Sequence, residues 1–335
     1  MQYEKGIFLF DVEVELAWGH IGEAISKEAE LRMKDASMKA RDHVDDFLQL
    51  LDKYQIPTTF GILGHAALDH CENVGMPHAD MPRPSYSWLR EDWYKHDPCK
   101  TLTDEPAFYG KDIVDKIVNW VSQTELSNDI ACHSFSHQLF GDPGCTEEVA
   151  DAELKKCLKI MKENYGIRPR VFIFPRDFPG HLKVLKRNGF IAFRGPIPHV
   201  MTYSESPKGI SNAIMKYASL GSYLGSFYLS MSPPVVQHSV EEGLTNIPAS
   251  MCYNKKPFIP LRLVKSKAMK GIDRAVKEKR IFHLYTHEIN LGEAPDTEAF
   301  LESLEEILAH ADSFRKQNRL LITTTRKFAE STRED

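Results

Sequence analysis

A strand that runs directly into polar residues decides the fold of this chain, and it is clearest at Asp129-Ile130-Ala131-Cys132-His133-Ser134-Phe135-Ser136-His137. Residues 129–132 predict a buried β-strand, because a nearly continuous apolar run is typical of parallel strands that are covered on both faces. A helical pattern follows at Glu147–Tyr165, where Thr146 is a suitable N-cap and Gly166 a suitable C-cap. A strand, a polar strand end and a helix thus form one unit.

The same unit recurs along the whole chain. Apolar residues have helical spacing at Ala36–Tyr54, Ile113–Val121, His181–Asn188 and Thr297–Arg315. Further strands are predicted at the apolar runs Ile7–Phe10, Thr58–Leu63, Val171–Phe174, Phe190–Phe193, Thr245–Pro248, Ile281–Tyr285 and Leu320–Thr323. This alternation predicts a (β/α) barrel or an open α/β sheet. No glycine-rich phosphate-binding motif follows the first strand, which argues against a nucleotide-binding fold.

Composition and charge exclude two classes of protein. Hydrophobic residues make up 42 % and charged residues 27 % of the 335 residues, as is ordinary for a globular protein. The formal net charge of -5 argues against nucleic-acid binding, and no apolar run approaches the roughly 20 residues of a membrane span. The apolar run at residues 6–10 is too short for the core of a signal peptide, so we expect a cytoplasmic protein.

The cysteines give no sign of a disulfide framework. There are six of them, scattered along the chain, and none forms a C-x-x-C pair. We therefore expect reduced, partly buried thiols rather than disulfides or a thiolate zinc site.

Two stretches interrupt the alternation of strands and helices. Residues 69–108 are rich in Pro, His, Trp and Tyr, and residues 196–243 contain several Pro and Gly residues. Long loops in a compact domain are usually functional or disordered. We therefore predict a single domain over residues 1–335, with these two insertions capping one end.

Three acids follow the first predicted strand at alternate positions, Asp11, Glu13 and Glu15. Alternate residues of a strand share a face, so the three carboxylates converge if the strand continues. Buried carboxylates need a compensating cation or proton. A polar strand end in water would explain the same residues. Their position after a buried strand favours a site, because α/β enzymes place their chemistry at the C-terminal ends of strands.

Histidines follow two other strands. His133 and His137 can bind one cation from a tight loop or a helical turn, because imidazole is a good zinc ligand, although this spacing also occurs by chance. On the late strand, His283 and His287 share a face, and His287 ends the strand. A histidine there suits proton donation, since its pKa lies near working pH, and the alternative is a partly exposed structural histidine.

Arginines follow two more strands. Arg176 can pair with and orient a carboxylate, or form a surface ion pair with Asp177, and Arg194 repeats that layout one strand later. Polar clusters at several strand ends predict a single site with one cation, an acid–base pair and an arginine. Because a cation-bound water is nucleophilic near neutral pH, the sequence predicts a metal-dependent hydrolase.

These residues resemble the polysaccharide deacetylases of the NodB-homology type, carbohydrate esterase family 4. The family's first motif, of the Thr-Phe-Asp-Asp type, corresponds to Phe10–Glu13, and its His-(Ser/Thr)-x-x-x-His motif, or one close to it, to His133–His137. Its second strand, its arginine loop and its late Leu-x-His strand correspond to Thr58–Gly64, Pro175-Arg176 and Leu284–His287. The matches extend from about residue 7 to about residue 290.

The resemblance implies a distorted (β/α) barrel with fewer than eight complete strands. It also implies Asp11 as the general base, Arg176 as the residue that orients Asp11, and His287 as the general acid. His133 and His137 would hold a divalent metal, most commonly zinc.

The third metal ligand is where the chain departs from the family pattern. The usual second acid of the first motif is Val12 here. We therefore assign the third ligand to Glu13, which faces the same way as Asp11, with Glu15 as a weaker substitute.

The expected reaction is removal of the N-acetyl group from an amino sugar in a polysaccharide or glycan precursor, with Arg194 and Trp18 among the substrate contacts. One alternative is a deformylase or another amide hydrolase acting on a lipid-linked sugar or a small cyclic amide. A second is a non-catalytic carbohydrate-binding protein on the same fold, which Val12 in place of an acid favours.

Overall fold

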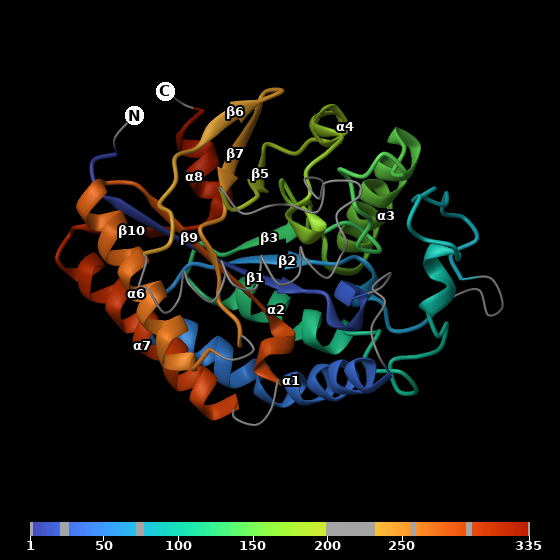
Figure 1. The fold of residues 1–335 in the computed structure, drawn as a ribbon, viewed down its shortest axis with the longest axis horizontal. Helices are drawn as coiled ribbons and strands as arrows, with labels where there is room; N and C mark the ends of the chain where they lie inside the picture. Colours follow the sequence, from blue (N-terminus) through green and yellow to red (C-terminus); the bar gives the residue numbers. More distant parts are fainter. Residues whose placement is uncertain are drawn as a thin grey trace.

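A computed structural model of the chain shows a curled sheet with helices packed around it (Figure 1). The structure describes residues 3–20, 27–71, 77–198, 232–255, 259–292 and 297–333.

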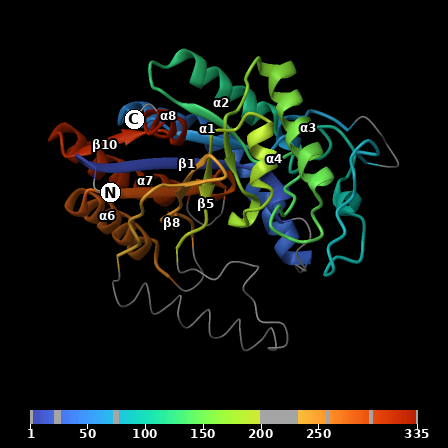
Figure 2. The same ribbon diagram turned by 90° about the horizontal axis from the view of Figure 1, so that it is seen from above.

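The sheet is strongly curled and consists mainly of parallel strands (Figure 2). Its strands are β1 Gly6–Val14, β2 Thr59–Ile62, β3 Asp129–Cys132, β4 Val171–Ile173, β5 Ala192–Gly195, β6 Ser239–Glu241, β7 Leu244–Pro248, β8 Met251–Cys252, β9 Ile281–His287 and β10 Leu320–Thr323. They follow the order β6-β7-β5-β4-β3-β2-β1-β9-β8, and β10 pairs with the first residues of β1. Only β6 and β7 pair in antiparallel fashion among these strands. An isolated bridge joins Val236, just before β6, to Ile281 of β9, which brings the two sides of the sheet together.

Seven helices of the described residues lie around this sheet: α1 Lys27–Lys53, α2 Lys111–Gln123, α3 Glu147–Tyr165, α4 Leu182–Arg187, α6 Leu261–Glu278, α7 Thr297–Lys316 and α8 Thr325–Ser331. Figure 1 shows α1, α6 and α7 on one side of β1 and β9, and α3 and α4 near β3 to β5. The expected distorted (β/α) barrel is therefore confirmed as a curled, incompletely closed version of that architecture.

Most strands and helices lie close to the residues predicted from the sequence pattern. The strands β3 and β10 and the helix α3 begin and end at the expected residues. In α3, the Thr146 side chain accepts a hydrogen bond from the Val149 amide, and Gly166 adopts a left-handed φ of 66°, so both expected caps are confirmed. The short strands β6 and β8 and the helices α6 and α8 were not expected.

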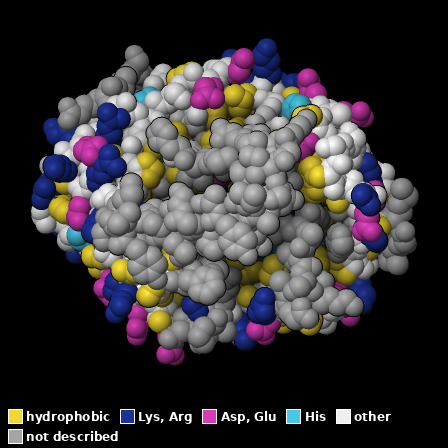
Figure 3. Space-filling model, viewed as in Figure 1, with side chains coloured by type: hydrophobic (Ala, Val, Ile, Leu, Met, Phe, Trp, Pro, Cys, Tyr) yellow, Lys and Arg dark blue, Asp and Glu magenta, His cyan; other side chains and the backbone are white. Residues whose placement is uncertain are grey.

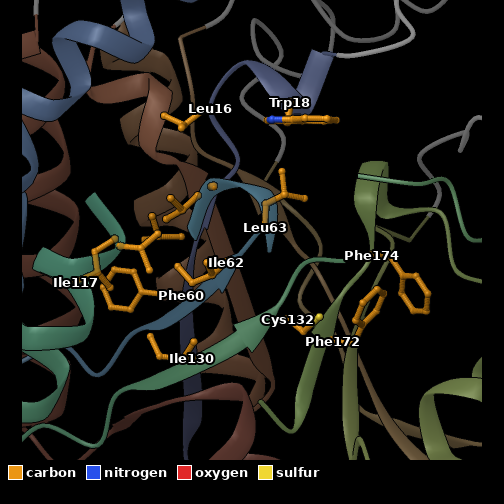
Figure 4. Close-up of a cluster of buried hydrophobic side chains, with 14 of the residues drawn as sticks. Leu16, Trp18, Phe60, Ile62, Leu63, Ile117, Ile130, Cys132, Phe172 and Phe174 are labelled. Atoms are coloured by element: carbon orange, nitrogen blue, oxygen red, sulfur yellow. The ribbon is translucent and has the colours of Figure 1, made fainter. Parts of the chain in front are cut away.

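Apolar side chains fill the space between the sheet and its helices (Figure 4). Phe60 of β2 is fully buried and packs edge-on against Trp120 of α2, with ring centroids 6.0 Å apart. Phe172 of β4 is also fully buried and contacts Phe140 and Phe174. This packing holds the strands in register, so their C-terminal ends meet at one edge of the barrel.

The insertion at residues 69–108 is tied to the barrel by specific contacts. A disulfide joins Cys71 to Cys99, so our expectation of reduced thiols is wrong for this pair, whereas the other four cysteines are free. The pairing depends on the fold of the insertion, because 28 residues separate the two cysteines. The indole Nε1 of Trp93, in the 3₁₀ turn Trp93–His96, donates to the Ser136 carbonyl at 2.9 Å.

The second expected insertion, residues 196–243, falls largely outside the described residues, which resume at residue 232 and include β6. On the face shown in Figure 3, basic and acidic side chains alternate around the margin without a single-sign patch. None of the described helices combines the length and apolar character needed to cross a bilayer.

Candidate active site

Polar side chains converge where the parallel strands end. They are Glu13 of β1, Glu15 just beyond it, His133 and His137 after β3, Arg176 and Asp177 after β4, Arg194 of β5, and Tyr285 and His287 of β9. The register of β1 with β9 places Glu13 opposite His287. All of these residues except His133 line one pocket, and His133 lies directly beneath it in contact with Glu13 and Glu15.

Glu15, His133 and His137 form a compact group, which we name the His–His–Glu group. The Nε2 atoms of His133 and His137 lie 3.1 and 3.0 Å from the same oxygen, Oε2 of Glu15. The three ligand atoms lie within 4.8 Å of one another, and all three side chains are buried. Ligand atoms around a tetrahedral zinc ion are about 3.3 Å apart, so the spacing suits such a cation.

The hydrogen bonds of His133 support a cation at this group. Its Nδ1 lies 2.9 Å from the Ile173 carbonyl, which can only accept, so Nδ1 carries a proton. The Nε2 then faces the Glu15 carboxylate, another acceptor, and a proton or a cation has to lie between them. Burial alone would lower the pKa of His133, but the hydrogen bond to Glu15 and the charge of Glu13 outweigh it and raise the pKa.

His137 is suited to bind a metal in its neutral form. Burial lowers the pKa of His137 to about 4, so its imidazole carries no charge near pH 7. Burial would raise the pKa of Glu15, but the charge of His287 and the hydrogen bonds of His133 and His137 hold that pKa well below its usual value. Glu15 is therefore an anion between two histidines, which fits a divalent cation.

This geometry favours Glu15 over Glu13, the expected third ligand, as the carboxylate closest to both histidines. Oε2 of Glu13 is 3.3 Å from His133 Nε2, but its other oxygen accepts from Arg194 Nη2 at 2.7 Å. Glu13 is thus held between Arg194 and His133, whereas Glu15 faces both histidines. The backbone amides of Glu15 and Leu16 donate to the buried carboxylate of Glu288 at 3.1 and 2.8 Å, which fixes the position of Glu15.

Arg194 takes the position expected for Arg176. Its guanidinium is shielded from solvent and donates from Nη2 to Glu13 at 2.7 Å and to Asp177 at 2.9 Å. It also stacks on the ring of Tyr285, whose hydroxyl donates to Asp177 at 2.9 Å. Burial would lower the pKa of Arg194, but the charges of Glu13 and Asp177 outweigh it, so Arg194 stays a cation. It is therefore bound within the protein and orients Glu13.

Asp11, the expected general base, lies deeper than the pocket. Its carboxylate is fully buried, accepts from Thr325 at 3.3 Å, and lies 2.8 Å from Nε2 of His283. Arg194 Nη1 is 3.8 Å away. Asp11 does not line the pocket, so the geometry favours Glu13 over Asp11 as the group that meets a substrate. Arg176 lines the pocket, and its charge contributes to the low pKa of His137.

His287 is the most accessible histidine of the site. Its side chain is 22 % exposed, and its Nε2 lies 3.6 Å from Glu15 and 3.9 Å from Glu13. Burial would lower the pKa of His287, but the charges of Glu13 and Glu15 outweigh it and hold the pKa well above its usual value. His287 is therefore protonated near neutral pH, as a proton donor must be.

Trp18 does not contact the pocket as expected. Its side chain is fully buried and packs on His65, with ring centroids 4.1 Å apart. The expected substrate contact of Trp18 is therefore wrong, because the residues after Glu15 turn this ring into the core.

Four residues around the site have a strained backbone. Ser134, His137, Arg176 and Asp177 have φ values of 64°, 64°, 53° and 49°, a region that residues other than glycine seldom adopt. Such strain persists only where the surrounding structure imposes it, and it is frequent at functional sites.

Sequence reasoning missed several supporting residues. The buried carboxylate of Glu153 on α3 accepts from the amides of Phe135 and Ser136 at 3.0 and 2.7 Å, and so holds the loop between the two histidines. The sequence did offer a signal for Glu153, because an acid on the apolar face of a helix is rarely buried without a partner. Glu288, directly after His287, carried no comparable signal.

The family model of the polysaccharide deacetylases matches residues 35–188 of the chain. The matched segment contains His133, His137 and Arg176, but it begins after Glu15 and ends before Arg194 and His287. No curated protein matches the chain in sequence.

Solved structures share the fold over nearly the whole chain. A candidate polysaccharide deacetylase from Mycobacterium smegmatis superimposes with a TM-score of 0.57 and 14 % identity, covering 100 % of this chain and 93 % of that one. A candidate polysaccharide deacetylase from Pseudomonas aeruginosa PAO1 gives 0.56 and 11 %, covering 97 % and 89 %. The allantoinase Puue gives 0.55 and 11 %, also covering 97 % and 89 %. The family model covers less than half of the chain, and the solved structures, at 11–14 % identity, show that this chain shares their fold.

Proposed function

We propose that the chain is a metal-dependent deacetylase that hydrolyses the N-acetyl group of an amino sugar in a polysaccharide or glycan precursor. The observation that carries the proposal is the His–His–Glu group beside Glu13 and His287, which lie in or next to one pocket at the strand ends. The family match over residues 35–188 supports a carbohydrate substrate.

Glu15, His133 and His137 would hold the metal. Zinc is the proposed ion, because two imidazoles and one carboxylate are a common catalytic ligand set for it. When bound, such a cation polarises a carbonyl and makes water a nucleophile near neutral pH.

Glu13 is the proposed general base. Its carboxylate lines the pocket, and Arg194 holds one of its oxygens at 2.7 Å. The other oxygen, Oε2, lies 3.3 Å from Nε2 of His133 and is the one proposed to take a proton from an attacking water. Asp11, with both oxygens engaged below the pocket, serves as a positioning residue rather than a base.

His287 is the proposed general acid. An amine leaves poorly as an anion, so the leaving nitrogen needs a proton from the enzyme. His287 lines the pocket on the side of β9, opposite the histidines that follow β3, and the charges of Glu13 and Glu15 keep it protonated.

The second candidate function is hydrolysis of a small cyclic amide, which the shared fold of the allantoinase Puue supports. Deformylation of a lipid-linked sugar and carbohydrate binding without catalysis are the competing outcomes of the same test. The zinc-loaded protein should be incubated with N-acetylated amino-sugar oligomers, their N-formyl analogues and allantoin. The proposal expects acetate release that disappears in Glu13→Gln. Formate release alone, ring opening alone, or no product despite bound zinc would each refute it.

A further inference from the structure

A second cluster of two histidines and one carboxylate lies away from the pocket. His65 belongs to the 3₁₀ turn His65–Ala67 after β2, whereas His78 and Asp97 belong to the insertion at residues 69–108. The Nε2 atoms of His65 and His78 lie 3.2 and 2.7 Å from the same Asp97 oxygen, Oδ2. All three side chains are buried, and the cluster shares no residue with the His–His–Glu group.

The hydrogen bonds of His65 do not balance without a further positive charge. Its Nδ1 lies 3.2 Å from the Phe108 carbonyl, and its Nε2 faces the Asp97 carboxylate. Both partners can only accept, but a neutral imidazole has one donor. His133 has the same imbalance beside Glu15. In both places, a cation between the second nitrogen and the carboxylate would remove the conflict.

The remaining bonds of Asp97 aim one of its oxygens at the two histidines. Its Oδ1 accepts from the Tyr109 hydroxyl at 2.9 Å and from the Cys99 amide at 2.8 Å. Supporting bonds of this kind orient metal-binding carboxylates. The three ligand atoms lie within 4.8 Å of one another. The His65–Asp97 separation of 3.2 Å is near the roughly 3.3 Å expected around tetrahedral zinc, and the His78–Asp97 separation of 2.7 Å is shorter, so Asp97 and His78 would have to move apart slightly to hold the ion.

We propose that His65, His78 and Asp97 form a second cation site, of the zinc type, that fastens the insertion at residues 69–108 to the end of β2. Imidazole nitrogen with one carboxylate oxygen favours zinc over calcium or magnesium, which prefer oxygen ligands alone. His78 lines a surface pocket, from which water can complete the coordination.

We infer a structural role for this site. Its histidines pack against the loop between His133 and His137, and none of its three residues lines the active-site pocket. The ring of Phe135, between His133 and His137, lies 5.8 Å from the ring of His65 and 5.0 Å from that of His78. A cation that fixes His65 and His78 would therefore also fix the loop that carries the histidines of the His–His–Glu group. The proposal does not depend on the deacetylase reaction.

The test separates the two sites by stoichiometry. Full-length protein with His133→Ala and His137→Ala would be titrated with Zn²⁺ against a chromophoric chelator, and retained zinc measured after desalting. We expect one equivalent of zinc in this variant and none when Asp97→Asn is added. His70→Ala is the matched control, because His70 lies on the same insertion but is exposed and pairs with Asp69. Added to the His133→Ala, His137→Ala protein, His70→Ala should leave the one equivalent of bound zinc in place.

The proposal would be overturned if the His133→Ala, His137→Ala protein bound no zinc. It would also be overturned if that protein still bound one equivalent of zinc after Asp97→Asn was added. Should Asp97→Asn fail to fold, His78→Gln serves in its place. Thermal unfolding adds a second readout, since a cation that binds only the folded state raises Tm. No rise with zinc in the His133→Ala, His137→Ala protein would also refute the second site. The active-site assignment is tested separately, by measuring zinc in Asp97→Asn protein that keeps His133 and His137. Absence of bound zinc in that protein would count against the active-site group and not against the second site.

Discussion

Replacing Glu15 by glutamine tests which acid completes the active-site metal ligands. Glu15→Gln keeps the size of the side chain but removes the charge on Oε2, the oxygen that faces both His133 and His137. Zinc binding to a four-ligand protein site is worth about 10–16 kcal/mol, so one ligand contributes about 3 kcal/mol. We therefore expect zinc to bind this site roughly a hundredfold more weakly in Glu15→Gln.

The assay is competition for Zn²⁺ with a chromophoric chelator, performed in the Asp97→Asn background so that only the active-site group is measured. Glu13→Gln is the matched control: its carboxylate is held by Arg194, and we expect a loss in affinity of about tenfold, the lower end of the range for a supporting residue. Near-normal affinity in Glu15→Gln, together with a hundredfold loss in Glu13→Gln, would restore Glu13 as the ligand and refute the reasoning.

Three further changes test other parts of the structure. His287→Ala should keep its zinc but lose about 10²–10⁴-fold in kcat, because the leaving amine loses its proton donor; unchanged turnover would contradict the assignment. Changing both Cys71 and Cys99 to serine should lower the free energy of unfolding by about 3.5 kcal/mol, the chain-entropy value for a 28-residue loop, as measured by urea denaturation with oxidised protein as reference. Burial raises the pKa of Asp129 to about 7, so the folded state favours its protonated form and stability should fall as pH rises from about 4 to about 7. Asp129→Asn should flatten that fall in urea titrations at several pH values, and an unchanged slope would count against it.

The strands were predictable because burial on both faces leaves a nearly continuous apolar run. The helix α6 was not predicted, because half of its buried residues are small, namely Ala268, Gly271 and Ala275. These let the helix approach β1 closely: a Cβ added to Gly6 would lie 2.8 Å from the backbone of Ala275. Small residues carry little apolar periodicity, so the pattern that located α3 was absent here.

The arginine that contacts Glu13 is not the one expected to orient the base, and the reason is topological. Arg176 and Arg194 both follow the expected layout after a strand, and the sequence offers no means of choosing between them. The choice depends on how far the sheet curls, because Glu13 and Arg194 belong to strands that are not neighbours and lie 181 residues apart in the chain. The strain at Arg176 is likewise invisible in sequence.

The valine at position 12 does not argue against catalysis once the depth of each acid is considered. Adjacent residues of a regular strand face opposite sides, and Val12 is buried in the hydrophobic core behind β1. The alternate positions Asp11, Glu13 and Glu15 face the barrel interior at successive depths and meet different partners there: His283, Arg194 and the two metal-site histidines. Two acids at the pocket are therefore supplied without any acid at position 12. Val12 is thus compatible with the proposed catalysis, because the proposed base Glu13 and the proposed ligand Glu15 lie on the same face of the strand as Asp11.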